Sequence, residues 1–451
     1  MPIQLSDHFT FKRLLRFAAP SIFMMMFISI YGVVDGLFVS RFVGKTAFAS
    51  INLVMPFVMI LGGMGFMIGT GGTALVSKTL GEGDKKRANR YFTMMVYFTL
   101  ILGAILTAFG VIFMRPIVYF LGASEEMIED CVTYGIAVIA FTSSFMLQNL
   151  FQSFLVTAEK PKLGLFATVG AGITNMILDA LFIAVLKMGV LGAALATGIS
   201  QCVGALIPLV YFLKKNDCVL KLVKTKLEIK PIVRACTNGS SELMSNISMS
   251  IVSMLYNFKL MDIFGENGVS AYGVLMYVQF IFISIFIGYV IGAAPIIGYN
   301  YGADNREELQ NIFKKSVIFM SVSGAALTLM AILLASPLAQ IFVGYDKSLF
   351  ELTKHAFYLF SVSFLLAGLN IFASNMFTAL NNGLISAVIS FLRTLVFQAL
   401  AVLFLPAIIG EDGIWYSIVI AELAAFVISF ICVMAYRKKY HYIPERIIKE
   451  A

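Results

Sequence analysis

Residues 79–92 read TLGEGDKKRANRYF, and residues 300–313 read NYGADNREELQNIF. Each copy directly follows a long apolar run, the second such run of its half of the chain. Two further pairs are shifted along the chain by nearly the same amount: YFLGASEEM (119–127) with IFVGYDKSL (341–349), and NLFQSFLVTAEKPKLGL (149–165) with NIFASNMFTALNNGLIS (370–386). Because a shift of 221 or 222 residues relates all three pairs, the chain is an internal duplication.

The composition of the chain is that of an integral membrane protein. Of its 451 residues, 59% are hydrophobic and only 13% are charged, whereas soluble domains carry about 25% charged residues. A helix of about 20 apolar residues crosses a hydrocarbon layer of about 30 Å. We predict about twelve such spans, near 15–40, 47–77, 91–114, 130–157, 163–186, 190–213, 233–261, 268–300, 312–335, 352–380, 384–408 and 413–436.

The predicted fold is an all-α polytopic membrane protein made of two duplicated six-helix bundles. The N-terminal lobe covers residues 1–213, a basic loop covers 214–232, and the C-terminal lobe with its basic tail covers 233–451. Because six is an even number of crossings, both halves have the same orientation. Transporters built in this way hold their substrate site between the halves.

The net charge of +8 is explained by topology. The terminal segments and alternate loops contain 25 of the 33 Lys and Arg residues, and the opposite loops contain 7. Positive loops stay in the cytoplasm, so we expect both termini to be cytoplasmic in a multi-pass protein of the inner (plasma) cell membrane. This distribution removes the reason to infer a nucleic-acid partner.

Five charged residues fall well inside the predicted spans: Asp35, Asp179, Glu242, Arg393 and Glu422. A charge near the middle of a bilayer costs about 2.5–3.5 kcal/mol on insertion scales, so such residues usually face a cavity or a partner. The simpler explanation for each is a misplaced helix end or a structural ion pair.

Asp179 lies in the apolar run GITNMILDALFI (172–183), four residues after Asn175 and therefore on the same helix face. Asp35 lies in the first span and Thr197 in the sixth. Carboxylate, amide and hydroxyl oxygens suit a hard cation. Two carboxylates in a dry pocket repel each other, so the pair could instead hold a proton. Composition permits this cluster without showing that the three helices meet.

These features together resemble the multidrug and toxic compound extrusion (MATE) transporters. The resemblance rests on Asp35, the Asn175-x-x-x-Asp179 pair, the LGEGD and YGAD loops, the run NLFQSFLVTAEKP and the duplication, and it covers essentially the whole chain. It implies two six-helix lobes around a central cavity, with inward Na⁺ or H⁺ driving export of bulky, often cationic amphiphiles. It also implies that Asp35, Asn175, Asp179 and Thr197 bind the coupling cation, as a metal site if the ion is Na⁺, and that there is no other cofactor.

One branch of that family uses acids on the seventh, eighth and tenth helices, but here only the seventh offers one, Glu242. This favours the N-terminal cation site. Glu242 could recognise a cationic drug or pair with Arg393. We favour the ion pair, because an unpaired Arg in a span is costly. Glu422 is a further candidate partner for Arg393.

Most of the 24 Met and 41 Phe residues should pack in the core or face lipid. A minority could line a cavity, because flexible Met and flat aromatic side chains suit sites that accept many ligands. The candidates are Met24, Met25, Met55, Met276 and Phe280.

Two other functions are compatible with parts of this pattern. A flippase for lipid-linked sugars would place several cationic side chains in its cavity, but the spans offer only Arg393. A non-transporting scaffold would not need buried acids. The residues suggest no enzyme, and we expect a monomer whose partners are small amphiphiles and the lipid bilayer. Na⁺ and H⁺ coupling both fit the same oxygens.

Overall fold

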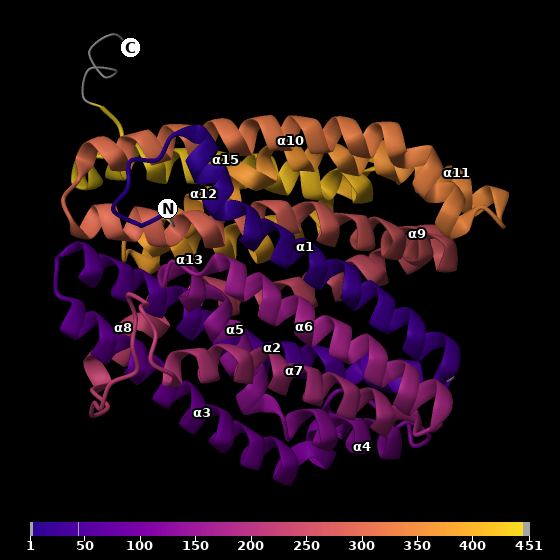
Figure 1. Cartoon of the computed structure of the whole chain (residues 1–451). Coiled ribbons are helices and arrows are strands. Elements are labelled where there is room, and N and C mark those ends of the chain that lie inside the picture. Colours follow the sequence, from indigo (N-terminus) through magenta and orange to yellow (C-terminus); the bar gives the residue numbers. More distant parts are fainter. Residues whose placement is uncertain (1–2, 44, 445–451) are drawn as a thin grey trace.

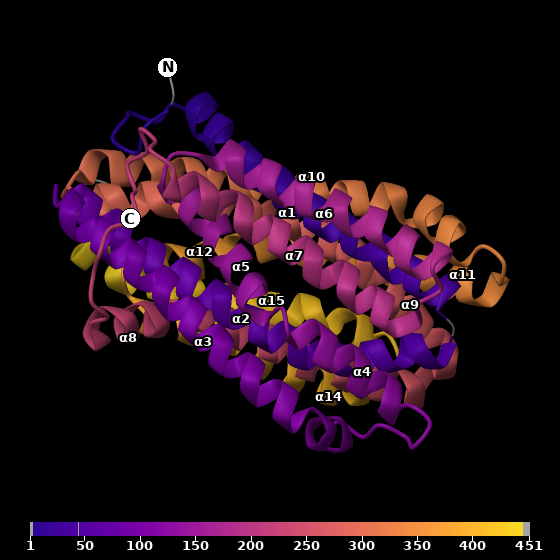
Figure 2. The ribbon, with the colours of Figure 1, turned by 60° about the horizontal axis from the view of Figure 1, so that its bottom comes forward.

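The computed structural model describes residues 3–43 and 45–444, in which long helices run side by side along one axis (Figure 1). In that view the N-terminal half forms the lower lobe and the C-terminal half the upper lobe, and the helices remain roughly parallel when the molecule is turned (Figure 2). α1 begins and α15 ends at the same end of the bundle, which we call the terminal end.

The helices follow the duplication. The N lobe contains α1 (Phe11–Phe42), α2 (Lys45–Gly81), α3 (Lys85–Phe120), α4 (Ile128–Ile139), α5 (Thr142–Thr157), α6 (Pro161–Asp179), the π-helical turn η1 (Ala180–Val185) and α7 (Gly189–Leu213). A short helix, α8 (Ile229–Asn238), precedes the C lobe. The C lobe contains α9 (Ser240–Gly302), α10 (Arg306–Val343), α11 (Lys347–Phe360), the 3-10 turn η2 (Ser361–Ser363), α12 (Phe364–Ala379), α13 (Gly383–Phe391), the π-helical turn η3 (Leu392–Val396), α14 (Phe397–Ile409) and α15 (Gly413–Tyr440).

Ten helical runs in the described residues are long and apolar enough to cross a membrane, and the α4–α5 pair, bent by 53°, makes an eleventh. The longest run, α9, has 63 residues. Since an α-helix rises by about 1.5 Å per residue, this run is far longer than a bilayer is thick. Gly265 interrupts it with φ 61° and ψ −149°, so α9 is two spans. The described chain thus has twelve spans, and the predicted fold class is confirmed.

The repeated loop sequence is a helix-capping motif. The Asp84 side chain accepts a hydrogen bond from the backbone N–H of Arg87 (2.9 Å) at the start of α3. Its counterpart Asn305 accepts one from Glu308 (3.1 Å) at the start of α10. Such caps satisfy backbone donors that have no partner within the helix. The preceding Gly83 has φ 85°, which glycine adopts without steric cost.

The two lobes touch backbone to backbone near the terminal end, and the contact is reciprocal. A Cβ atom added to Gly81 would lie closer than 3.0 Å to the carbonyl oxygen of Tyr299, and one added to Gly302 would lie as close to the carbonyl oxygen of Lys78. The shift that relates the repeated loops also leads from Gly81 to Gly302 and from Lys78 to Tyr299. A pseudo-twofold axis therefore passes through this contact, and the lobes are closed here.

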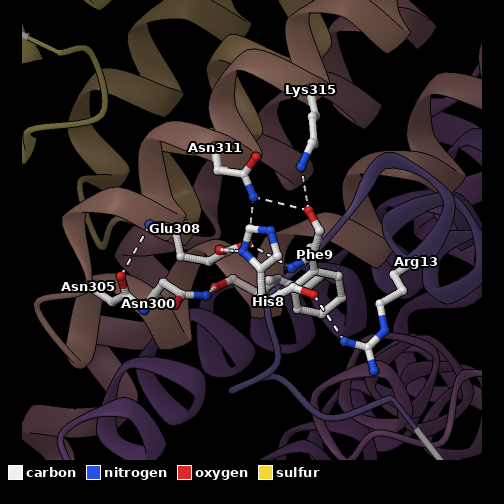
Figure 3. A network of polar contacts seen from close by, with 9 residues as sticks. His8, Phe9, Arg13, Asn300, Asn305, Glu308, Asn311 and Lys315 are labelled. Carbon is white, nitrogen blue, oxygen red and sulfur yellow. Dashed lines mark hydrogen bonds and ion pairs between the residues drawn. The ribbon is translucent and has the colours of Figure 1, made fainter.

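The segment before α1 is bound to the C lobe (Figure 3). The Phe9 backbone N–H donates to Glu308 Oε1 (2.9 Å), and His8 Nδ1 lies 2.6 Å from Glu308 Oε2. The side chains of Asn311 and Lys315 donate to the Phe9 carbonyl oxygen. The Phe9 ring is fully buried, so this segment is part of the folded structure.

The same segment also reaches the N lobe. The Leu5 backbone N–H donates to Glu159 Oε1 (2.7 Å) in the turn between α5 and α6. Burial raises the pKa of the Glu159 carboxyl, and this hydrogen bond partly opposes the shift. Residues 3–10 therefore connect the two lobes at the terminal end.

The structure corrects two predicted spans. The seventh span begins at Ser240 rather than near 233, because Ile229–Asn238 forms the separate helix α8. The fourth span, predicted as one helix, is bent between Ile139 and Thr142. The proposed lobe boundaries at 213 and 233 stay a prediction.

Candidate functional site

The acids of the first and fifth spans meet. α1 packs along α6 in the N lobe. This brings the Asp35 and Asp179 carboxyl groups close enough to interact electrostatically. Asp179 is 1% exposed and Asn175, one helical turn earlier, is 2% exposed. The sequence pattern therefore corresponds to a buried acid, Asp179, with the Asn175 amide one turn away and the half-buried Asp35 close by.

Several oxygens of this cluster have no hydrogen-bond partner among the described residues. They are Asp35 Oδ1, Asn175 Oδ1 and both carboxyl oxygens of Asp179. Buried polar atoms are normally paired, because an unpaired one costs free energy. Two negatively charged carboxylates in contact would also repel each other. A proton or a small hard cation between them satisfies both requirements, so the donor set fits either ion.

Local structure at Asp179 is unusual for a span. α6 ends at Asp179 and continues as the π-helical turn η1. Such turns are rare and occur frequently at functional sites. Sequence reasoning missed two neighbours of the pair, Tyr31 and Tyr134, whose phenols lie within electrostatic reach of Asp35. Tyr31 precedes Asp35 by four residues, and this spacing was the available signal.

Thr197 is placed less clearly than the other three predicted residues. It lies on α7, which packs along α6, and is half-buried. Its carbonyl oxygen accepts a hydrogen bond from Ser200 Oγ (2.7 Å). The structure shows no hydrogen bond from its side chain to the acid pair within the described residues. The structure thus joins Asp35, Asn175 and Asp179, and membership of Thr197 stays a prediction.

In the C lobe, Arg393 pairs with Glu422 and not with Glu242. Arg393 Nη2 lies 2.7 Å from Glu422 Oε1, and Arg393 Nε donates to both carboxyl oxygens at 2.9 and 3.0 Å. Asn370 Nδ2 donates to Glu422 Oε2 (2.7 Å). Glu422 is 2% exposed. The expectation that Arg393 needs a carboxylate is confirmed, but the expected partner was wrong, because α15 carries its acid to this position.

Glu242 is left with a different neighbour. It lies in the first turn of α9, and its carboxyl group contacts the side chain of Asn375 on α12. Asn375 also lines a narrow gap between the lobes, together with polar residues of the N lobe: Thr70, Thr73 and Ser153. The gap is small, and Glu242 therefore stands beside a polar contact between the lobes.

A seam of hydroxyl groups joins α12 and α13 in the C lobe. Ser374 Oγ lies 2.9 Å from Ser386 Oγ and 2.7 Å from Ser390 Oγ, and Thr378 Oγ1 donates to Ser386 Oγ (2.7 Å). Sequence reasoning did not identify this seam. The available signal was hydroxyl residues four positions apart on each of two neighbouring helices, 374 and 378 on one and 386, 390 and 394 on the other.

The five proposed cavity residues have varied surroundings. Met24 is 1% exposed and lies close to Gly164 of α6, inside the N lobe. Met55 Sδ lies 3.9 Å from the Tyr134 hydroxyl. Met25 and Met276 pack against the core of the C lobe. Phe280 is 46% exposed. Their role as substrate contacts stays a prediction.

Comparison with known proteins identifies the chain's relatives. The MatE family model matches residues 20–181 and 243–403, one block in each lobe. A multidrug export protein MepA from Staphylococcus saprophyticus is 26% identical over 430 residues, covering 93% of this chain and 94% of the relative. Another, from Staphylococcus haemolyticus, is 25% identical over 425 residues, covering 93% of each chain.

Solved structures share the fold over nearly the whole chain. A MATE transporter in complex with MaL6 superposes with a TM-score of 0.91 at 23% identity, covering 96% of this chain and 98% of that one. An outward-facing multidrug resistance MATE transporter superposes with a TM-score of 0.89, also at 23% identity and with the same coverage. With twelve spans in two lobes and the family model matched in both halves, the chain belongs to the multidrug and toxic compound extrusion (MATE) family of transporters.

Proposed function

We propose that this chain is an ion-coupled antiporter that exports bulky amphiphilic or cationic small molecules by alternating access. The observation that carries the proposal is the contact between Asp35 and Asp179 in the spans, with carboxyl oxygens that have no partner among the described residues. The MepA relatives are multidrug export proteins. Ion coupling is our inference from the acid pair.

The acid pair can couple ion movement to a change in helix packing. One proton or one Na⁺ between Asp35 and Asp179 removes the repulsion that would otherwise push α1 away from α6. Binding and release of the ion therefore favour different packing of these helices. If the ion lowers the affinity for drug in the outward-open state, linkage requires that drug lowers the affinity for the ion by the same factor.

Glu242 is our candidate for contact with a cationic substrate. Its other predicted partner, Arg393, is bound to Glu422, and Glu242 stands next to the gap between the lobes. A carboxylate there would attract a cation when the lobes separate. Glu242→Gln should therefore impair export of cationic substrates more than export of neutral ones. Equal effects on both would contradict this assignment.

The topology and partners complete the proposal. Positive residues concentrate in the loops of the terminal end, so we place this end in the cytoplasm and the protein in the cell membrane. The reciprocal glycine contact then closes the cytoplasmic side. We expect a monomer without enzymatic activity and without a nucleic-acid partner. The mid-span Arg393 is occupied by Glu422, so it is not available for the phosphates that a lipid flippase would bind.

Ethidium efflux from proteoliposomes tests the proposal. The purified protein is reconstituted, and efflux is measured under an imposed Na⁺ gradient and, separately, under a pH gradient. We expect one gradient to drive efflux and Asp35→Asn and Asp179→Asn each to abolish the driven part. Asp217→Asn, which changes a loop acid outside the spans, is the matched control and should leave efflux unchanged.

The outcomes separate the alternatives. Efflux driven by one gradient and lost in both acid variants identifies the coupling ion. Full-rate driven efflux by Asp35→Asn or Asp179→Asn would reduce the pair to a structural role. Absence of gradient-driven efflux in the unmodified protein would refute the antiport proposal itself.

A further inference from the structure

The short helix α8 carries an apolar pair on its outer face. Its inner residues pack against α2 and are buried: Pro231, Ile232, Ala235 and Asn238. On the other side Ile229 is 80% exposed and Val233 is 51% exposed. They are four residues apart and so lie one above the other on the helix surface. This apolar pair has no covering element within the described structure.

Basic residues lie before, between and after the two residues of the apolar pair along the chain. We call them the basic strip: Lys221, Lys224, Lys226, Lys230 and Arg234, all exposed. Residues 214–234 contain only two acids, Asp217 and Glu228. Within the described residues, no carboxylate forms an ion pair with a charged nitrogen of the strip. The strip is therefore a positive surface that the protein does not neutralise by ion pairs.

The backbone beneath the strip is held in place. The Lys221 backbone N–H donates to Asn89 Oδ1 (2.9 Å), and that of Val223 donates to Thr93 Oγ1 (3.0 Å). Leu220 is fully buried. Residues 220–223, between α7 and α8, are therefore bound to α3. The charges consequently project from a defined surface beside α8.

The position of α8 shows where this surface lies along the membrane spans. α8 lies beside α2 and directly precedes α9, at the terminal end of the spans and on the periphery of the bundle (Figures 1 and 2). We infer from this position that α8 lies near the level at which the spans leave the bilayer. A helix there with aliphatic residues between Lys and Arg is typical of an interfacial helix, whose apolar side enters the acyl boundary while its cations meet headgroups.

We propose that α8 and the basic strip form a docking surface for anionic phospholipid headgroups of the adjacent leaflet. Ile229 and Val233 enter the outer part of the acyl layer, and the strip binds lipid phosphates. A nucleic acid or a soluble acidic protein would match the charges but would leave the aliphatic pair in water. An anionic bilayer surface satisfies both parts of this face.

Lipid binding at α8 would also affect the contact between the lobes, because α8 and the start of α9 pack against α2. A Cβ atom on Gly71 of α2 would lie closer than 3.0 Å to the carbonyl oxygen of Ala235 and the backbone nitrogen of Gly239. The backbone of α8 and the start of α9 therefore rest directly on α2. Anionic lipid bound to α8 would stabilise this part of the cytoplasmic closure, whichever ion drives transport.

Lipid-specific quenching tests the proposal in the full-length protein. The five cysteines are replaced by alanine, and Val233→Cys is labelled with a bilayer-sensitive fluorophore in nanodiscs of mixed phosphatidylcholine and phosphatidylglycerol. Spin-labelled phosphatidylglycerol or spin-labelled phosphatidylcholine is then added as quencher. We expect phosphatidylglycerol to quench about twofold more strongly or better, and the preference to disappear in high salt.

Two matched variants make the result specific. Replacing the five residues of the basic strip by Gln should abolish the preference while leaving some quenching by both lipids. Ile318→Cys, exposed on α10 away from the strip, should be quenched equally by both lipids. Equal quenching at position 233 would overturn the headgroup preference. Absence of quenching there, in protein that elutes as a single species, would overturn docking on the bilayer and indicate that protein or water covers α8.

Discussion

Gly302→Ala should open the terminal end of the transporter. A Cβ atom at this position would lie closer than 3.0 Å to the carbonyl oxygen, carbonyl carbon and Cα of Lys78. These are all backbone atoms of α2, so no side chain can rotate away. The closed arrangement can accept the methyl group only if α9 moves away from α2.

The size of the effect follows from the cost of overpacking. Extra methyl groups in well-packed contacts cost about 1–3 kcal/mol. The cost applies to the closed state and not to a state in which the lobes are apart. Since about 1.4 kcal/mol corresponds to a tenfold change in an equilibrium constant, the closed-to-open ratio should fall about 5- to 150-fold.

Thiol labelling measures this shift. Thr73→Cys lies in the gap between the lobes, where the native residue is 4% exposed. In a background without other cysteines, an impermeant maleimide should label it faster by a similar factor when Gly302→Ala is present. The counterpart change Gly81→Ala should act in the same way, because its Cβ would meet the Tyr299 carbonyl oxygen.

Gly273→Ala is the matched control. It lies in the same helix, α9, where an added Cβ would meet nothing within 4 Å. Labelling at position 73 should be unchanged in this variant. The reasoning is refuted if Gly302→Ala labels at the native rate, or if Gly273→Ala accelerates labelling equally, since the latter would indicate a general loosening of α9.

Three further changes test other contacts. Glu422→Ala leaves Arg393 without a carboxylate inside a span and should lower the free energy of unfolding in denaturing detergent by about 3–5 kcal/mol. Replacing both partners, with Glu422→Leu and Arg393→Met, should recover most of this loss. A loss below about 1 kcal/mol for Glu422→Ala would show that the pair is solvated. Phe9→Ala should release the segment before α1 and speed its cleavage by a protease, and an unchanged cleavage rate would contradict docking of that segment. Because burial raises the pKa of Glu159, the folded protein binds a proton there more tightly than the unfolded chain, so stability falls as pH rises through the interval between the two pKa values. Glu159→Gln should flatten this fall in thermal unfolding curves while keeping an acceptor for the Leu5 N–H, and an unaltered pH profile would exclude Glu159 as its cause.

Hydropathy predicted the spans because each transmembrane helix must satisfy its own backbone hydrogen bonds. The duplication predicted their grouping and the shared capping loops. The start of the seventh span could not be predicted from the sequence, because it depends on a contact between residues that are far apart in the chain. Gly239 separates α8 from α9 and lies against the Met67 carbonyl oxygen of α2, so the break is a property of the packed structure.

In the acid cluster and in the Arg393 ion pair, contacts within one helix could be predicted from the sequence, whereas contacts between helices could not. Asn175 and Asp179 could be paired from their spacing, because positions four apart share a helix face. The approach of Asp35 depends on how α1 packs on α6, and spacing contains no information about that. Arg393 had two candidate acids at comparable depth, Glu242 and Glu422. Only the packing of η3, which contains Arg393, against α15 decides between them, and it favours Glu422.

The reciprocal contact of Gly81 and Gly302 has the form of an isologous dimer interface, in which one surface binds its own copy. In a true homodimer every residue would occur twice, and a cation site in one subunit would be repeated in the other. Fusion of two copies into one chain removes that constraint. The shift that carries Gly81 onto Gly302 leads from Asp35 to Tyr256 and from Asp179 to Leu400, so the second copy lacks the acid pair. The nearly symmetric helix arrangement thus carries the Asp35/Asp179 acid pair in the N lobe and no counterpart of it in the C lobe. The proposed stoichiometry is therefore one ion site per chain.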